Sequence, residues 1–72
     1  MKISAVARPY ILTFRATGAS YPLGSEEVQR LLDSYAVVTA TKNRVILRGD
    51  DGREAAIRPA TFGGGPAFLV ER

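Results

Sequence analysis

The stretch from residue 36 to residue 58 constrains the fold most, because it contains two turn sequences and one alternation of apolar side chains that must agree with each other. Apolar residues at every second position are typical of a strand with one buried face. A two-residue hairpin loop is predicted at Lys42-Asn43, with its asparagine at positive φ. In this register residue 40 pairs with residue 45 and residue 38 with residue 47, so one face carries Val38, Ala40, Val45 and Leu47.

The second turn, Gly49-Asp50-Asp51-Gly52, decides whether the next strand keeps this apolar face. As a type I turn with its second glycine in the left-handed bulge position, it pairs residue 48 with residue 54. A loop with an even number of residues would instead place Leu47 opposite Glu54 and lose the face. The glycine bulge is therefore predicted, and the apolar face gains Ala55 and Ile57.

Residues 10 to 16 are predicted to form a strand with one buried face, carrying Tyr10, Leu12, Phe14 and Ala16. We expect the rings of Tyr10 and Phe14 to lie in the core. Pro9 lacks an N–H donor, so residues 3 to 8 form either a separate edge segment or a continuation of this strand through a bend. The segment from Gly18 to Pro22 is expected to end the strand.

Residues 25 to 34 are predicted to form the helix of the fold. Ser25 is expected to cap it, and Glu26 and Glu27 complement the positive end of the helix dipole. The spacing i, i+3, i+4 and i+7 gives one apolar face, formed by Val28, Leu31, Leu32 and Tyr35. A helix this short is marginal alone and must be stabilised by packing on a sheet.

The last part of the chain completes the predicted fold. Pro59 is expected to end the strand that follows the second turn, residues 60 to 66 to form a loop, and residues 67 to 70 to form a last short strand. The order strand-helix-strand-strand-strand-strand predicts an α+β fold with a single domain over residues 1–72. We expect a mostly antiparallel sheet of four to five strands with one short helix packed on one face.

The composition removes whole classes of chemistry. With 72 residues, no cysteine and no histidine, the chain lacks the usual ligands of zinc, haem and iron–sulfur sites and the groups of thiol and histidine catalysis. A chain this short is also not expected to enclose the roughly 300 Å³ of a small-molecule pocket. We therefore expect a protein that is not an enzyme and binds no metal or cofactor. The absence of cysteine and of a long apolar segment favours the cytoplasm over a membrane.

Two weaker patterns have ordinary explanations. Gly63-Gly64-Gly65 is followed by a proline and a strand rather than by GK[ST] and a helix, which favours a flexible connection or close approach of a partner over a phosphate-binding loop. Asp50, Asp51 and Glu54 are interpreted as a hydrated turn rather than a cation site. Tyr21 is either an exposed loop residue or packs on the helix.

The sheet face turned away from the helix is the candidate binding surface. The register places Arg48 opposite Glu54, a favourable pair, and Arg44 opposite Arg58, where like charges cost roughly 0.2–1 kcal/mol. Two adjacent guanidinium groups suit a phosphate or a carboxylate, although long side chains can also spread into water and interact little. The candidate partner-binding or anion-binding residues are Arg8, Arg15, Arg44, Ile46, Arg48 and Arg58.

These features favour a non-catalytic binding protein, a regulator or accessory factor that docks on a larger protein or nucleoprotein complex. A viral or mobile-element inhibitor of a host machine, such as an RNA polymerase in transcription or a nuclease complex, is one class of this kind. The first alternative is a nucleic-acid-binding module that uses the arginine-rich sheet face, although the predicted helix is acidic on its outer side. The second alternative is a self-assembling structural subunit that pairs its strand edges.

Overall fold

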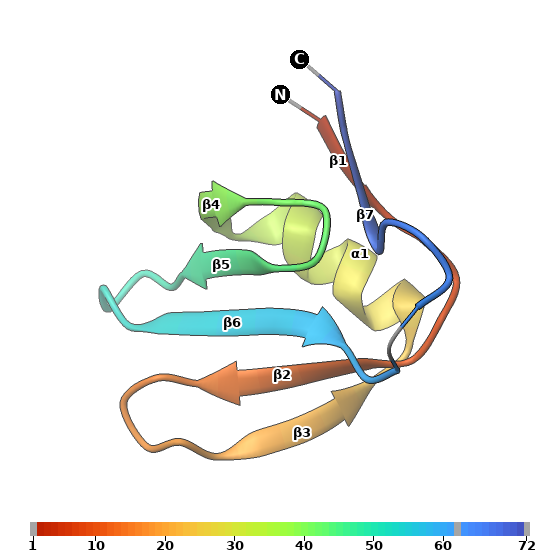
Figure 1. The fold of residues 1–72 in the computed structure, drawn as a ribbon. Coiled ribbons are helices and arrows are strands. Elements are labelled where there is room, and N and C mark those ends of the chain that lie inside the picture. The colour runs from red at the N-terminus through yellow and green to blue at the C-terminus, as the bar shows by residue number, and fades with distance from the viewer. Residues whose placement is uncertain (1, 62, 72) are drawn as a thin grey trace.

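The computed structural model describes residues 2–61 and 63–71 and shows two antiparallel sheets and one helix (Figure 1). The larger sheet has five strands in the order β3-β2-β6-β5-β4, and β1 and β7 form a separate two-stranded ribbon. The expected α+β class, with one helix on one face of an antiparallel sheet, is confirmed. The elements are β1 (Lys2–Ala5), β2 (Tyr10–Phe14), β3 (Ser20–Leu23), α1 (Ser25–Ser34), β4 (Ala36–Ala40), β5 (Val45–Arg48), β6 (Glu54–Pro59) and β7 (Phe68–Glu71).

The turn between β5 and β6 has the predicted geometry. Gly52 has φ +81°, and its N–H donates to the carbonyl of Gly49 at 3.0 Å. The N–H of Gly49 donates in turn to the carbonyl of Arg53 at 2.9 Å. The register follows as expected, with Arg48 opposite Glu54. The apolar face is therefore kept, and it buries Val45, Leu47 and Ile57.

The hairpin between β4 and β5 differs from its prediction. Ala40 pairs with Val45 as expected, but β4 bulges between Val37 and Thr39, so Val37 rather than Val38 pairs with Leu47. The side chain of Val38 is consequently exposed. The extra residue strengthens the twist of this edge strand, which is separated from the helix by the single residue Tyr35.

The turn that closes this hairpin also differs. Within the described ranges every residue with positive φ is a glycine, so Asn43 does not adopt the left-handed conformation that was expected. Instead the hydroxyl oxygen of Thr41 accepts the N–H of Arg44 at 3.0 Å and that of Asn43 at 3.4 Å. A threonine side chain thus closes a turn that a backbone carbonyl would otherwise close.

Strand β3 was not predicted, because Pro22 was taken as a sign that the strand had ended. β3 pairs with β2, with Pro22 opposite Ile11, and lies at the edge of the sheet. An edge strand tolerates proline, since its missing N–H can face solvent. The observed order is therefore three strands, the helix and four strands.

The rings of β2 fall into two environments. Tyr10 is fully buried, as predicted, but Phe14 is 41% exposed, so its assignment to the core was wrong. Phe14 is the last residue of β2 and packs against Tyr21 with the ring centroids 5.8 Å apart. Tyr21 is thus exposed beside another ring, rather than packed on the helix.

Helix α1 has the predicted bounds but a different cap. The N-cap residue is Gly24, and Ser25 is the first helical residue. The carboxylate of Glu27 accepts the N–H of Gly24 at 3.4 Å, so the side-chain hydrogen bond at the start of the helix comes from an acidic residue and not from the hydroxyl of Ser25. The helix buries Val28 and Leu32 against the sheet.

Residues 2 to 5 form a separate strand, which was one of the two alternatives. The side chain of Gln29 binds the free edge of β1: its Oε1 accepts the N–H of Ala5 at 2.9 Å, and its Nε2 donates to the carbonyl of Ile3 at 3.1 Å. One amide side chain thereby supplies the acceptor and the donor that a neighbouring strand would supply. This contact attaches the β1–β7 ribbon to the helix.

Tyr10 attaches the same ribbon to the sheet. Its hydroxyl lies 2.6 Å from the carbonyl oxygen of Val6 and 2.8 Å from that of Ala67, and its ring packs on Phe68 with centroids 5.3 Å apart. Burial raises the pKa of this phenol, because ionisation inside the core would cost solvation energy. The hydroxyl therefore stays protonated and bridges the two strands.

We expect Gln29→Ala to loosen the ribbon without unfolding the larger sheet. The loss of both side-chain hydrogen bonds should reduce the free energy of unfolding by ~1–3 kcal/mol. Amide hydrogen exchange should speed up selectively at Ala5. Arg30→Ala, at an exposed neighbouring helix position, is the control and should leave both quantities nearly unchanged. Unaltered exchange at Ala5 would contradict this role of Gln29.

Candidate binding surface

The face of the five-stranded sheet opposite α1 is open. The helix and the β1–β7 ribbon share the core on the other side, and no helix or strand among the described residues covers the open face (Figure 1). Side chains alternate along each strand, so the residues that precede and follow the buried ones in sequence lie on this face. They include Ile11, Thr13, Thr39, Arg44, Ile46, Arg48, Glu54, Ala56 and Arg58.

Ile46 lies near the centre of this open face but offers little surface. It pairs with Thr39 on one side and Ala56 on the other, and it is 9% exposed. Ile46 was a candidate contact residue, and its position on this face is as expected. Its neighbours cover it so well that a partner would touch mainly the longer side chains around it.

Glu54 binds two of the candidate arginines. Its carboxylate lies 3.0 Å from the guanidinium of Arg48, the predicted partner, and 2.8 Å from that of Arg15. The hydrogen bond from Arg48 and then that from Arg15 hold the pKa of Glu54 below its usual value of 4.5. Arg15 follows the end of β2, and its N–H donates to the backbone carbonyl of the same Glu54 at 3.1 Å.

Arg44 and Arg58 keep their charges uncompensated. Val45 pairs with Ile57, so the same register places the residue before Val45, Arg44, opposite the residue after Ile57, Arg58, as predicted. Both are exposed, and neither forms an ion pair within residues 2–61 and 63–71. We call Arg15, Arg44, Arg48, Arg58 and Glu54 together the arginine face. Its excess of three positive charges equals the net charge of the whole chain, +3.

Arg8 does not lie on the arginine face. Its guanidinium donates to the carbonyl oxygens of Gly63 at 2.6 Å, Thr61 at 3.2 Å and Gly65 at 3.3 Å, and to the Thr61 hydroxyl at 3.3 Å. In the structure Arg8 thus holds the loop before β7, and its contact with a partner stays a prediction.

The three consecutive glycines are explained by the same contact. Gly63, Gly64 and Gly65 have φ of +82°, +81° and +79°, a backbone conformation that residues with a Cβ atom rarely adopt. This backbone brings the carbonyls of the first and third glycine to one guanidinium. The group that lies close to this backbone is Arg8 of the same chain, and the close approach of a partner stays a prediction.

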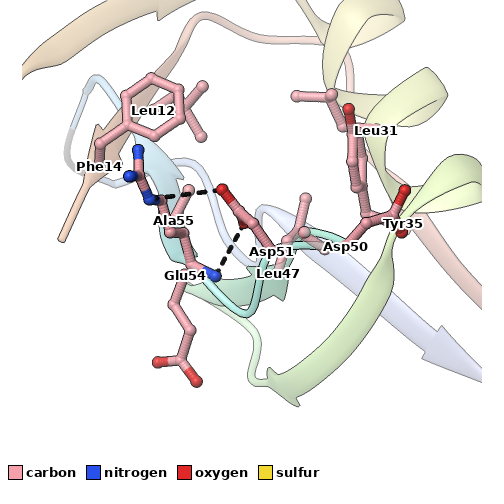
Figure 2. A pocket seen from close by; sticks show the side chains of 11 residues that line it. Leu12, Phe14, Leu31, Tyr35, Leu47, Asp50, Asp51, Glu54 and Ala55 are labelled. Carbon is pink, nitrogen blue, oxygen red and sulfur yellow. Dashed lines mark hydrogen bonds and ion pairs between the residues drawn. The ribbon is translucent and has the colours of Figure 1, made fainter. Parts of the chain in front are cut away.

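A groove that the sequence patterns do not predict lies on the other side of the sheet. It has a volume of about 540 Å³ and is open to solvent, so it is a surface groove rather than the enclosed pocket that a chain this short was not expected to form (Figure 2). The space arises because the sheet extends past the end of the ten-residue helix. It is lined by Leu12, Phe14, Leu31, Tyr35, Leu47, Gly49, Asp50, Asp51, Arg53, Glu54 and Ala55.

Comparison with known proteins gives no relative from which a function could be transferred: no protein-family model, no curated protein and no solved structure matches the chain significantly. Among the described residues, no cluster of three or more His, Cys, Asp or Glu side chains could hold a metal ion. In the same part of the chain, no helix has the length and apolar character needed to cross a membrane. The function must therefore be argued from the two surfaces alone.

Arg8→Ala is expected to release the loop of residues 61 to 65. Loss of the guanidinium contacts should lower the free energy of unfolding by ~1–2 kcal/mol and make this loop the first site of proteolysis. Arg30→Ala removes an exposed arginine that makes no such contact and serves as the control. Equal stability and equal proteolysis of the two variants would show that Arg8 does not hold the loop.

Glu54→Gln tests the double ion pair through its pH dependence. Because the pKa of Glu54 is lowered in the folded chain, its contribution to stability is present above pH 4.5 and is lost as the pH falls through the folded value. The variant should therefore be less stable than the parent at pH 7, and the difference should shrink by pH 3. Urea unfolding at both pH values measures this difference. Asp50→Asn, at an exposed carboxylate without an ion pair in the described ranges, is the control.

Proposed function

We propose that this chain is a non-catalytic binding protein, a regulator or accessory factor that docks its arginine face on an acidic surface of a larger protein or nucleoprotein complex. The observation that carries the proposal is the uncovered sheet face, on which Arg44 and Arg58 lie opposite each other and form no ion pair with any described residue. Guanidinium pairs form directed, charge-assisted hydrogen bonds with carboxylates and phosphates. A partner anion would remove the repulsion between the two arginines.

The positions of the aromatic rings favour a protein surface over single-stranded nucleic acid. Proteins that bind single strands combine a basic groove with aromatic rings on which bases stack. Tyr10 and Phe14 alternate with the outward residues of β2, and Tyr21 pairs with Leu12 on the helix side. No aromatic residue of β2 to β6 shares the arginine face. Nucleic acid binding through phosphate contacts of the same arginines stays the alternative.

The edges of the larger sheet support docking through its face. β3 carries Pro22, and β4 is interrupted by the bulge at Val38. Proline and bulges both hinder the addition of a further strand. Self-assembly through these edges is therefore less supported than face docking. We also propose that the chain acts in the cytoplasm. A viral or mobile-element protein that inhibits a host machine is the kind of regulator that could be this small.

The double variant Arg44→Ser/Arg58→Ser tests the proposal. Capture of a partner complex from host lysate should be lost, while the melting temperature stays equal or rises, because two opposed like charges are removed. Lys2→Ser/Arg30→Ser, which removes two exposed cations outside both this face and the groove, is the matched control and should still capture the complex.

Two further measurements separate the alternatives. A captured complex that resists nuclease treatment supports a protein partner. Affinity for generic oligonucleotides that falls steeply between about 50 and 200 mM salt, and that the double variant loses, would replace the proposal with nucleic acid binding. A large loss of stability in the double variant with capture intact would show that the two arginines serve the fold rather than a partner.

A further inference from the structure

The groove beyond the end of α1 is lined by apolar and aromatic side chains. Leu31 and Tyr35 border it from the helix end, and Leu12 and Phe14 border it from β2 (Figure 2). Phe14 and Tyr35 are 41% and 45% exposed, and Tyr21 extends the aromatic wall through its edge contact with Phe14. Exposed rings that line one hollow mark a place where an apolar group can be buried.

The rim of this groove carries negative charge. Asp50 and Asp51 from the β5–β6 turn lie along it, and Asp50 forms no ion pair within the described ranges. The negative end of the helix dipole adds to this charge, because α1 ends at Ser34 next to Tyr35 and has no basic residue in its last turn. The faces of the aromatic rings also attract cations.

The remaining charged groups of the lining are already engaged. Arg53 lies with its Nε 3.3 Å from the carboxylate of Asp51, in a pair whose side chains are both largely exposed and which can exchange partners at little cost. Glu54 directs its carboxylate away from the groove (Figure 2). This carboxylate forms ion pairs with Arg15 and Arg48 of the opposite face. Because Arg53 compensates Asp51, the charge offered to a ligand is mainly that of Asp50, and that of Asp51 is added where its exposed pair with Arg53 opens.

We infer that this groove is a second binding site, which takes a segment of a partner protein in which an apolar side chain stands next to a lysine or arginine. The apolar side chain fills the hollow between Leu31 and Phe14, and the cation lies at the rim with Asp50 and Tyr35. A volume of about 540 Å³ lies in the range of ordinary binding pockets, about 300–1,000 Å³. This inference is independent of the arginine face, since it uses the opposite side of the sheet and the opposite charge preference.

The test uses the ¹⁵N-labelled full chain and two capped hexapeptides, one of alternating leucine and lysine and one of alternating leucine and glutamate. The lysine peptide should shift the amide signals of Leu31, Gly49, Gly52 and Ala55, and the glutamate peptide should bind at least about tenfold more weakly, since rim charges mainly set which partner is accepted. Signals shifted instead on the arginine face, or equal affinity for both peptides, would overturn the inference. No binding of the lysine peptide at millimolar concentration would overturn it as well.

Variants separate the charge contribution from the apolar contribution. Asp50→Asn/Asp51→Asn should weaken binding of the lysine peptide about three- to tenfold at low salt. Phe14→Ala should weaken it further, and since this ring is exposed at the end of β2 the fold should persist, as checked by its amide spectrum. Arg44→Ser/Arg58→Ser is the control that links the two proposals. This double variant should bind the lysine peptide as tightly as the parent does. If the proposed function of the arginine face proves wrong, the peptide experiment therefore still tests the groove.

A second copy of the chain is the competing occupant, because its own arginines could supply the cation. Sedimentation of the free protein at low micromolar concentration decides this point. A monomer that binds the lysine peptide supports the inference. A dimer that dissociates in Phe14→Ala would assign the groove to self-association and would overturn the partner proposed here.

Discussion

Both faces of the larger sheet depend on the turn between β5 and β6, because side chains alternate along a strand with a period of two. The left-handed Gly52 adds one residue to this loop and so keeps Leu47 opposite Ala55. That pairing directs the apolar side chains toward α1 and leaves Arg48 and Glu54 on the far side. A loop one residue shorter would exchange the two faces of β6. The binding surface is therefore a direct result of the register that builds the core.

Polar contacts act together with apolar packing to attach the β1–β7 ribbon, whose Ile3 and Phe68 lie in the common core. A two-stranded ribbon is marginally stable in water, so it needs support from the rest of the fold. Gln29 supplies that support on the edge of β1, and the buried hydroxyl of Tyr10 supplies it where the two strands meet the sheet. One short helix thus contacts both sheets: Val28 packs on the larger sheet, and Gln29 binds the backbone of the β1–β7 ribbon. Because this helix is short, part of the larger sheet stays uncovered, and the groove lies there.

The sequence allowed prediction of the features that depend on local patterns. The bounds of α1 follow from its apolar stripe, and the β5–β6 register with its ion pair follows from a glycine turn. The edge position of β3 could not be predicted, because tolerance of Pro22 is a property of the assembled sheet. The bulge at Val38 was also missed, since Val37 beside it is equally apolar. The contacts of Arg8 join residues more than 50 positions apart, and the groove depends on where the helix stops relative to the sheet.

The charge of the molecule is distributed unevenly. Four arginines and one glutamate give the open sheet face three positive charges, whereas the charges of the rest of the chain cancel and the helix carries Glu26, Glu27 and Asp33 against Arg30. Such an asymmetric molecule turns in the field of a charged partner before the two surfaces touch, which increases the fraction of productive collisions. Ionic strength should therefore act mainly on how fast a complex assembles, while short-range contacts set how long it lasts.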